Sequence, residues 1–287
     1  MIWLLSAFLW LLHWLPFRAV ALLGKVLGSL LYRVAGRRRR VGATNLQLCF
    51  PHLSEIERAQ LLRRHFQLMA TAMLEYGYCW YAPAKRLRQL VRVEGMQHLD
   101  ALKGQPVILF AGHFVGLEIG GLRLSADVPM MDLYTRQSNA GLDARLAAMR
   151  GRFGGRLVVR TEGVRPMIKG LREGLRLYYL PDQDYGPRDA EFLPFFGVKA
   201  ATITGMSRLA RVSGAAVVPC FVYRERDGYR LVLDAPLANF PSDDVVADAL
   251  RMNTELEARI RQAPEQYFWL HKRFKTRPEG EARLYAD

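Results

Sequence analysis

A histidine and a glutamate five positions apart are the residues of this sequence best suited to acid–base chemistry. His113 and Glu118 lie in the stretch AGHFVGLE, which begins at Ala111 after a short apolar run. In a continuous helix, two positions five apart point about 140° away from each other. If His113 instead occupies a non-helical position just before a helix, its ring can fold back over the first turn and reach Glu118. The carboxylate would then fix the imidazole tautomer, making His113 a competent general base.

Two other chemistries compete for His113, and the sequence lacks the partners that each would need. A hydrolase triad requires a serine nucleophile, but no G-x-S-x-G pattern occurs. A metal site requires an HExxH pattern or a second nearby histidine, and neither is present. A partly buried histidine beside a capped helix, without catalytic chemistry, is the remaining alternative. Without a protein nucleophile, we expect His113 to deprotonate a hydroxyl group on a bound acceptor.

The segments that must position His113 alternate between short apolar runs and longer amphipathic ones. This alternation predicts an α/β fold in which helices flank a β-sheet. Asp227-Gly228 predicts a hairpin between the last two strands, so the sheet should be mixed. Ser54 and Glu57 form a capping box that opens a helix running toward Trp80. The expected strands are 107–111, 131–134, 156–159, 176–180, 216–223 and 229–234, and the expected helices lie near 117–124, 142–153, 164–172, 202–213 and 243–262.

Four of the expected strands lead directly into a polar residue. These residues are His113, Arg136, Arg160 and Asp182. Ligands of open α/β sheets bind beyond the carboxyl ends of the strands. We therefore expect a basic rim with catalytic potential at one edge of the sheet.

The N-terminus carries an apolar run that predicts attachment to a membrane. Residues 2–17 are interrupted only by Ser6, His13 and Pro16, and they include three tryptophans, which favour a membrane–water boundary. The run is shorter than the roughly 20 residues that a membrane-spanning helix needs. A cleaved signal peptide is one alternative, but no basic segment precedes the run and no A-x-A site follows it. A buried hairpin within a soluble fold is the other.

The next segment favours a helix that lies in the membrane interface. Lys25, Ser29 and Arg33 recur at steps of four, so one helical face is polar and the rest is mostly apolar. Four consecutive arginines at 37–40 favour the cytoplasmic side. We therefore expect residues 1–36 to form a membrane anchor or interfacial helix, and 37–287 to form a cytoplasmic domain.

The composition limits the general class of protein and its partners. With 287 residues, of which 51% are apolar, the chain can bury a large core, which excludes general disorder. Three scattered cysteines without a CxxC pair exclude a disulfide framework and a zinc ribbon. The net charge of +14 indicates anionic partners. Nucleic acid is disfavoured, because the arginines are scattered and no nucleic-acid-binding motif occurs.

Several blocks of sequence resemble a known enzyme family. HFVGLE is similar to the H-x4-(D/E) motif of glycerolipid acyltransferases. The wider match is closer to the late acyltransferases of lipid A biosynthesis, the lauroyl and myristoyl transferases, and it covers the whole chain. The blocks that carry the resemblance are NLQLCFP (45–51), SEIER (54–58), YLPDQDYGP (179–187), FLPFFG (192–197), AATITG (200–205) and APEQYFWLHKRFKTRPEG (263–280).

The resemblance implies a fold and a reaction. The fold is glycerolipid acyltransferase-like, with 37–287 as the acyltransferase domain. An acyl chain, most closely of the lauroyl type, moves from acyl carrier protein to a hydroxyacyl group of Kdo-modified lipid IVA at the cytoplasmic face of the bacterial inner membrane. No metal or organic cofactor is implied. A myristoyl-type or other secondary acyltransferase, acting at another lipid A position or on another glycolipid, is the nearest alternative. A non-catalytic, basic, membrane-tethered binding protein is the alternative from another class.

The resemblance also assigns roles to residues. It implies that His113 is the general base and Glu118 its partner, and that Arg150 and Asp182 match polar residues that the family needs. A one-residue gap near Arg150 makes Arg152 a possible substitute. Residue 183 is Gln where several relatives carry His, which argues against an essential imidazole there and leaves Asp184 as the second acidic residue.

Other residues are candidates for contacts with the substrates. Arg136, Arg160 and Arg188 suit phosphate or Kdo carboxylate groups, because guanidinium forks match such oxygens. The basic run 271–277 is a candidate for binding acyl carrier protein or anionic headgroups. Phenylalanines 192, 195 and 196 are expected to line an acyl channel or to belong to the core.

Overall fold

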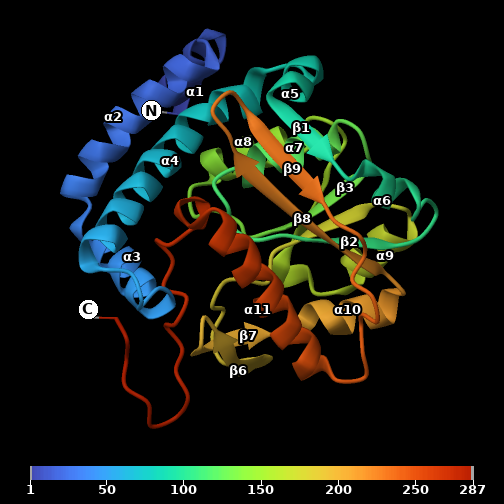
Figure 1. The fold of residues 1–287 in the computed structure, drawn as a ribbon. Helices are drawn as coiled ribbons and strands as arrows, with labels where there is room; N and C mark the ends of the chain where they lie inside the picture. The colour runs from blue at the N-terminus through green and yellow to red at the C-terminus, as the bar shows by residue number, and fades with distance from the viewer. Residues whose placement is uncertain (1, 286–287) are drawn as a thin grey trace.

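The protein is built around a β-sheet (Figure 1). A computed structural model describes residues 2–285. Seven strands form this sheet, and two more form a separate hairpin. The strands are β1 Val91–Glu94, β2 Val107–Phe110, β3 Met130–Tyr134, β4 Arg156–Val159, β5 Arg176–Tyr179, β6 Ala190–Phe195, β7 Val198–Ile203, β8 Ala216–Arg224 and β9 Tyr229–Leu233.

The seven-stranded sheet is mixed, as the sequence predicts. Its order is β1-β9-β8-β2-β5-β3-β4, with β8 and β9 antiparallel and the other neighbouring pairs parallel. All six expected strands occur, with ends within one residue of those predicted. The sequence pattern missed β1, a four-residue strand beside β9, and the β6–β7 hairpin, whose first strand contains Pro194.

Helices cover both faces of this sheet, and each face has its own core. The side chains of β2 alternate between the two cores: Ile108 and Phe110 pack into one, and Val107 and Leu109 into the other. The expected helices after residue 100 all occur, with ends within three residues of those predicted. The helices from the middle of the chain onward are α5 Ala84–Leu90, α6 Met96–Asp100, α7 Leu117–Ser125, α8 Ala140–Arg150, α9 Arg165–Arg172, α10 Gly205–Ser213 and α11 Val245–Gln262.

The N-terminal third consists of four helices. They are α1 Ile2–Trp14, α2 Phe17–Val34, α3 Gly36–Cys49 and α4 Glu55–Tyr81. The capping box that opens α4 is confirmed: Ser54 N–H donates to the Glu57 carboxylate over 2.7 Å, and Glu57 N–H donates to Ser54 Oγ over 3.3 Å. None of the described helices is both long and apolar enough to cross a membrane by itself, although α2 and α3, bent by 93°, are so in combination.

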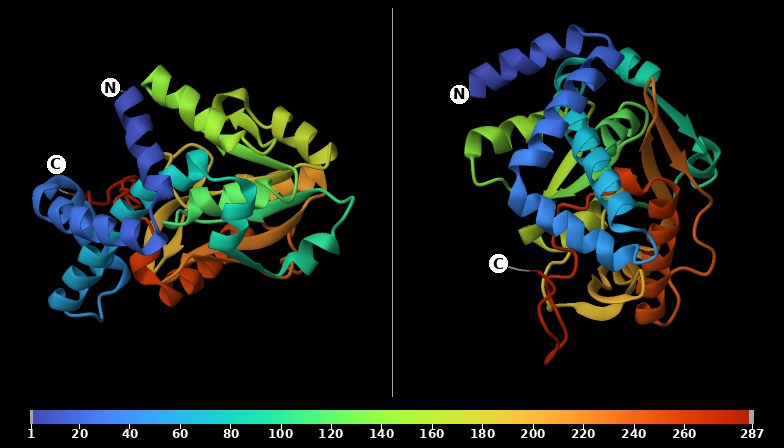
Figure 2. Two further views of the ribbon diagram at one scale, coloured as in Figure 1. Left: turned by 90° about the horizontal axis from the view of Figure 1, so that it is seen from above. Right: turned by 60° about the vertical axis from the view of Figure 1, so that its left-hand side comes forward.

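The N-terminal helices α1 and α2 lie along the outer side of α4 (Figure 2). Gly24 and Gly28 let α2 approach α4 closely, and Ser29 accepts a hydrogen bond from Gln67 Nε2 over 2.8 Å. Ser29, expected on a polar outer face, therefore takes part in helix packing. Lys25 and Arg33 are exposed as expected, and many apolar side chains of α1 and α2 are exposed as well: Trp3, Leu4, Leu11, Trp14, Leu22, Leu23, Val26, Leu30 and Val34. A division of the chain at residue 36 remains a prediction.

Candidate active site

His113 and Asp182 come together because their strands are parallel neighbours. β2 pairs with β5 so that Phe110 lies opposite Tyr179, and each strand is followed by one of the two polar residues. Ala111 N–H donates to the Tyr179 carbonyl over 3.0 Å, which continues the pairing beyond the strands. The expectation that these strand ends meet at one edge is confirmed.

The imidazole of His113 is oriented by Asp182. His113 Nδ1 lies 2.6 Å from Asp182 Oδ1, and the backbone N–H of His113 donates to Oδ2 over 2.8 Å. The Asp182 side chain is fully buried, whereas that of His113 is 24% exposed. Burial by itself would raise the pKa of Asp182, but the His113 imidazolium and the two hydrogen bonds bring it below its ordinary value. An ionised Asp182 accepts a hydrogen bond from His113 Nδ1–H, so Nε2 is left free to accept a proton.

The expected contact between His113 and Glu118 is wrong for this structure. Glu118 stands in the first turn of α7 and binds Arg150, the last residue of α8. Arg150 Nε donates to Glu118 Oε2 over 3.0 Å, and Arg150 Nη2 donates to Oε1. A bidentate guanidinium pair is stronger than a bond to a neutral ring, and Asp182 already occupies His113 Nδ1. Burial would lower the pKa of Arg150, but the Glu118 carboxylate raises it overall.

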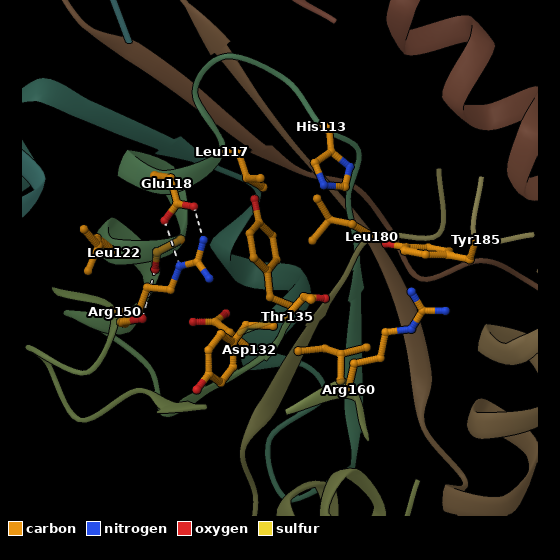
Figure 3. A pocket seen from close by; sticks show the side chains of 15 residues that line it. His113, Leu117, Glu118, Leu122, Asp132, Thr135, Arg150, Arg160, Leu180 and Tyr185 are labelled. Carbon is orange, nitrogen blue, oxygen red and sulfur yellow. Dashed lines mark hydrogen bonds and ion pairs between the residues drawn. The ribbon is translucent and has the colours of Figure 1, made fainter. Parts of the chain in front are cut away.

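His113 and the Glu118–Arg150 pair line the same cavity, which has a volume of about 120 Å³ (Figure 3). Asp132 and Arg160 contribute two further charged side chains. The Arg160 guanidinium lies 3.7 Å from the centre of the Tyr185 ring, which also lines the cavity. Leucines 117, 122, 133 and 180 supply apolar wall. The cavity therefore combines apolar walls with cations that can stabilise an oxyanion or bind an anionic group.

A second, more apolar hollow of about 230 Å³ meets the first at His113. Helix α4 forms one wall, with Met69, Ala72, Met73 and Tyr76 on one face. Phe114, Val115 and Phe268 form the opposite wall. Two hollows that open onto the same imidazole suit a reaction between two ligands.

The remaining arginines of the predicted site lie elsewhere. Arg136 and Arg188 are exposed and line neither hollow. Of the two arginines expected after strands, Arg136 and Arg160, only Arg160 lines the cavity. Arg152 is not a substitute for Arg150, because it donates to the carbonyls of Cys79 and Ala82 at the end of α4.

Asp184 holds the C-terminal segment in place. It is buried and accepts hydrogen bonds from Thr276 N–H over 2.6 Å and Thr276 Oγ1–H over 2.8 Å. Its own N–H donates to His271 Nε2 over 3.1 Å. In the same basic run, Arg273 is buried and donates to the Ala201 carbonyl, so only part of that run is free to meet a partner.

Of the two alternatives for the three phenylalanines, an acyl channel or the core, the structure favours the core for Phe195 and Phe196. Phe195 is fully buried in the core, and Phe196 packs against Phe50. None of the three lines either hollow. Conversely, two cavity residues, Asp132 and Tyr185, were not predicted from the sequence. Tyr185 stands within the YLPDQDYGP block, whereas Asp132 belongs to a strand without any motif.

No group of three or more histidine, cysteine or acidic residues within residues 2–285 is arranged to hold a metal ion.

Comparisons with known proteins agree over nearly the whole chain. Residues 1–276 match the family described as bacterial lipid A biosynthesis acyltransferase. The chain is 38% identical to the lipid A biosynthesis lauroyltransferase of Escherichia coli (strain K12), over 99% of this chain and 94% of the relative. It is 35% identical to the palmitoleoyltransferase of the same organism over the same shares, and 33% identical to its myristoyltransferase over 90% and 82%. Among solved structures, the 1-acyl-sn-glycerophosphate (LPA) acyltransferase PlsC from Thermotoga maritima matches with a TM-score of 0.41 and 14% identity, over 85% of this chain and 97% of that one.

Proposed function

Because the chain belongs to the bacterial lipid A biosynthesis acyltransferase family, and is thus an acyltransferase of that pathway, we propose a specific reaction for it. It transfers a fatty acyl chain from acyl carrier protein to a hydroxyacyl group of Kdo-modified lipid IVA. The observation that carries the proposal is a partly exposed imidazole, oriented by a buried carboxylate, where two hollows meet. That arrangement suits a base that activates the hydroxyl of one ligand against the thioester of another.

The proposed reaction needs only proton transfer and stabilisation of negative charge. His113 Nε2 accepts the proton of the acceptor hydroxyl while its oxygen attacks the thioester carbonyl carbon. The carbonyl π electrons move to the oxygen, and the Arg150 guanidinium, held by Glu118, stabilises this oxyanion. When the oxyanion collapses, the carbon–sulfur bond breaks and the thiolate accepts the proton from the His113 imidazolium. Asp182 keeps the imidazole in the required tautomer and stabilises its cation.

We assign the acyl chain to the lauroyl type. The relative named lauroyltransferase shares 38% of aligned residues, against 35% for the palmitoleoyltransferase and 33% for the myristoyltransferase. Incubation of radiolabelled Kdo-modified lipid IVA with carrier protein bearing 10-, 12-, 14- or 16-carbon chains tests this assignment. Fastest transfer of the 12-carbon chain is expected, and mass spectrometry of the product identifies the hydroxyl acylated. Fastest transfer of 14 or 16 carbons would instead support the myristoyl or palmitoleoyl type.

Substitution of His113 and of Glu118 tests the proposed chemistry. His113→Ala and Glu118→Ala should each nearly abolish acyl transfer, because the first removes the base and the second releases Arg150 from its place beside the cavity. Thermal melting and vesicle binding should stay those of the unaltered protein. Wild-type turnover in either variant would contradict the proposed site.

We place the enzyme at the cytoplasmic face of the bacterial inner membrane, held by the exposed apolar side of α1 and α2. Leu22, Val26 and Leu30 are 55–64% exposed on the outer side of α2. Apolar area of this kind on paired helices favours insertion into a lipid interface. Replacing these three residues by Ser should reduce flotation with phosphatidylglycerol-containing vesicles. Val212→Ser, at a 61% exposed position on α10, is the matched control and should leave flotation unchanged.

We also propose a basic surface for the acidic acyl carrier protein or for anionic headgroups. Arg37 and Arg40 on α3 line a hollow of about 220 Å³ together with Lys272 from the C-terminal segment. Arg40→Glu should raise the KM for the acyl donor if the carrier protein binds at this surface. It should weaken vesicle binding if anionic lipid binds there. If neither the KM nor vesicle binding changes, this surface binds neither the carrier protein nor lipid.

A further inference from the structure

A segment near the C-terminus pairs with the loop that carries His113. It consists of residues 264–269 of the block APEQYFWLHKRFKTRPEG, and we call it the strap. Phe268 N–H donates to the His113 carbonyl over 2.8 Å, and Val115 N–H donates to the Gln266 carbonyl over 2.9 Å. The His113 loop belongs to no regular strand or helix, so bonds of this kind fix its backbone.

Gln266 ties the strap to the sheet. Its Oε1 accepts a hydrogen bond from Arg224 N–H over 2.7 Å, and its Nε2 donates to the Arg224 carbonyl over 3.0 Å. Arg224 is the last residue of β8, and β8 is a parallel neighbour of β2, the strand that precedes His113. The Gln266 side chain is buried, so its loss would leave both backbone groups of Arg224 without these partners.

Tyr267 connects the strap with both members of the catalytic pair. Its backbone forms an antiparallel bridge with Phe114, the neighbour of His113, and the two rings pack with 5.7 Å between their centroids. The Tyr267 hydroxyl donates to the Asp182 carbonyl over 3.4 Å. The strap therefore holds the backbone on each side of the hydrogen bond between His113 Nδ1 and Asp182 Oδ1. Because a hydrogen bond weakens steeply with distance and angle, a shift of either loop would disturb this one.

We propose that Gln266 and Tyr267 are positioning residues for the acyl transfer and act by holding His113 at Asp182. This inference rests on the proposed function, and it adds two residues that do not touch the substrates. Neither residue lines the cavity at His113 or the hollow along α4. Gln266→Met keeps an unbranched side chain of similar length and removes both bonds to Arg224. A misplacement of about 1 Å can lower a rate about 100-fold, so for Q266M we expect kcat to fall by about 10- to 100-fold with little change in the KM for the donor.

The first experiment separates positioning from a general loss of stability. Transfer of a labelled dodecanoyl chain from carrier protein to Kdo-modified lipid IVA is measured with Q266M and with Asn253→Leu. Asn253 is a matched control, because it is buried and its Nδ2 donates to the Pro194 carbonyl over 2.8 Å and to Thr202 Oγ1 over 3.2 Å, but it lines neither hollow. Both substitutions should lower the melting temperature, whereas Q266M alone should lower kcat well below that temperature. An unchanged kcat in Q266M, or an equal loss in both variants, would overturn the proposal.

The second experiment asks whether Gln266 acts through the His113–Asp182 pair. In the Asp182→Asn variant this pair is already disturbed, so adding Q266M should lower kcat further by less than about 3-fold. The same loss in both backgrounds would mean that Gln266 does not act through Asp182, and it would overturn the proposal.

Tyr267→Phe keeps the proposal testable if Q266M does not fold. It removes one hydroxyl group, and the loss of one hydrogen bond corresponds to about 2- to 10-fold in kcat. Tyr78→Phe is its control, because the Tyr78 hydroxyl donates to the Leu15 carbonyl over 2.8 Å, at the turn between α1 and α2. An unchanged kcat in Tyr267→Phe, or an equal loss in Tyr78→Phe, would overturn the role of the strap. Absence of transfer by the unaltered, folded protein would instead count against the proposed function.

Discussion

Replacing Asp182 by Asn tests which carboxylate serves the catalytic histidine. Asp182 accepts two hydrogen bonds from one residue, from His113 Nδ1–H at 2.6 Å and from the His113 backbone N–H at 2.8 Å. An amide has one oxygen and one NH₂ group, so D182N can accept only one of these bonds. The other N–H of His113 would face a second donor in a buried place.

The expected loss of activity follows from these two bonds. A hydrogen bond to a charged group is worth about 1.5–3 kcal/mol, which corresponds to roughly 10- to 150-fold in rate. Loss of the charge also removes the stabilisation of the imidazolium and the fixed tautomer, an effect of about 10⁴-fold when the Asp of a serine-protease triad is replaced by Asn. For Asp182→Asn we therefore expect kcat to fall by about 10²- to 10⁴-fold.

The assay is transfer of a labelled acyl chain from carrier protein to Kdo-modified lipid IVA at saturating donor. Glu118→Gln is the comparison, because it removes the charge that holds Arg150 and leaves the His113–Asp182 bonds in place. Thermal melting shows whether each variant is folded. E118Q should also lose activity, through Arg150. If D182N keeps more than a tenth of kcat, Asp182 is not the working partner of His113 and our reasoning is refuted.

Three further predictions concern the stability of the fold. Burial lowers the pKa of His65 to about 4, so between pH 6.5 and 4 this histidine binds a proton in the unfolded chain but not in the folded one. The contribution of His65 to the free energy of unfolding should therefore fall by about 2 kcal/mol from pH 7 to pH 5. Urea unfolding at both pH values should show a smaller drop for His65→Gln. Asn45→Leu should cost about 2–5 kcal/mol by the same measurement, because Asn45 Nδ2 donates to the buried Trp269 carbonyl and to a second carbonyl. Gly28→Ala should lower stability by about 1–3 kcal/mol, because its Cβ would collide with the backbone of α4, whereas Gly36→Ala meets nothing closer than 3.8 Å and is the control.

Each of these predictions has an outcome that contradicts it. An unchanged pH dependence in the His65 variant would mean that this histidine protonates in the folded state. Asn45→Leu with unaltered stability would show that the C-terminal segment is not held by these bonds. Equal stability of the two glycine variants would contradict the close packing of α2 on α4.

Local sequence patterns were enough to predict most elements of the fold. β2, the strand that precedes His113, is a run of four apolar residues, and all four are buried, as a central parallel strand requires. The capping box at Ser54 and Glu57 is read from neighbouring residues alone, and both of its hydrogen bonds form. By contrast, β1 and β6 carry weak patterns, because their identity depends on the strand beside them.

The sequence by itself determined that His113 follows one strand closely and that Asp182 follows another, because the strands are recognised from local patterns. It could not determine which carboxylate meets the imidazole. Asp182 lies 69 positions from His113, and the two meet only because β2 and β5 are neighbours in the sheet. Likewise, Glu118 turns to Arg150 because α8 packs where its last residue faces the first turn of α7. Spacing along the chain favoured the nearer glutamate, but hydrogen bonding depends on distance in space, and strand order sets that distance.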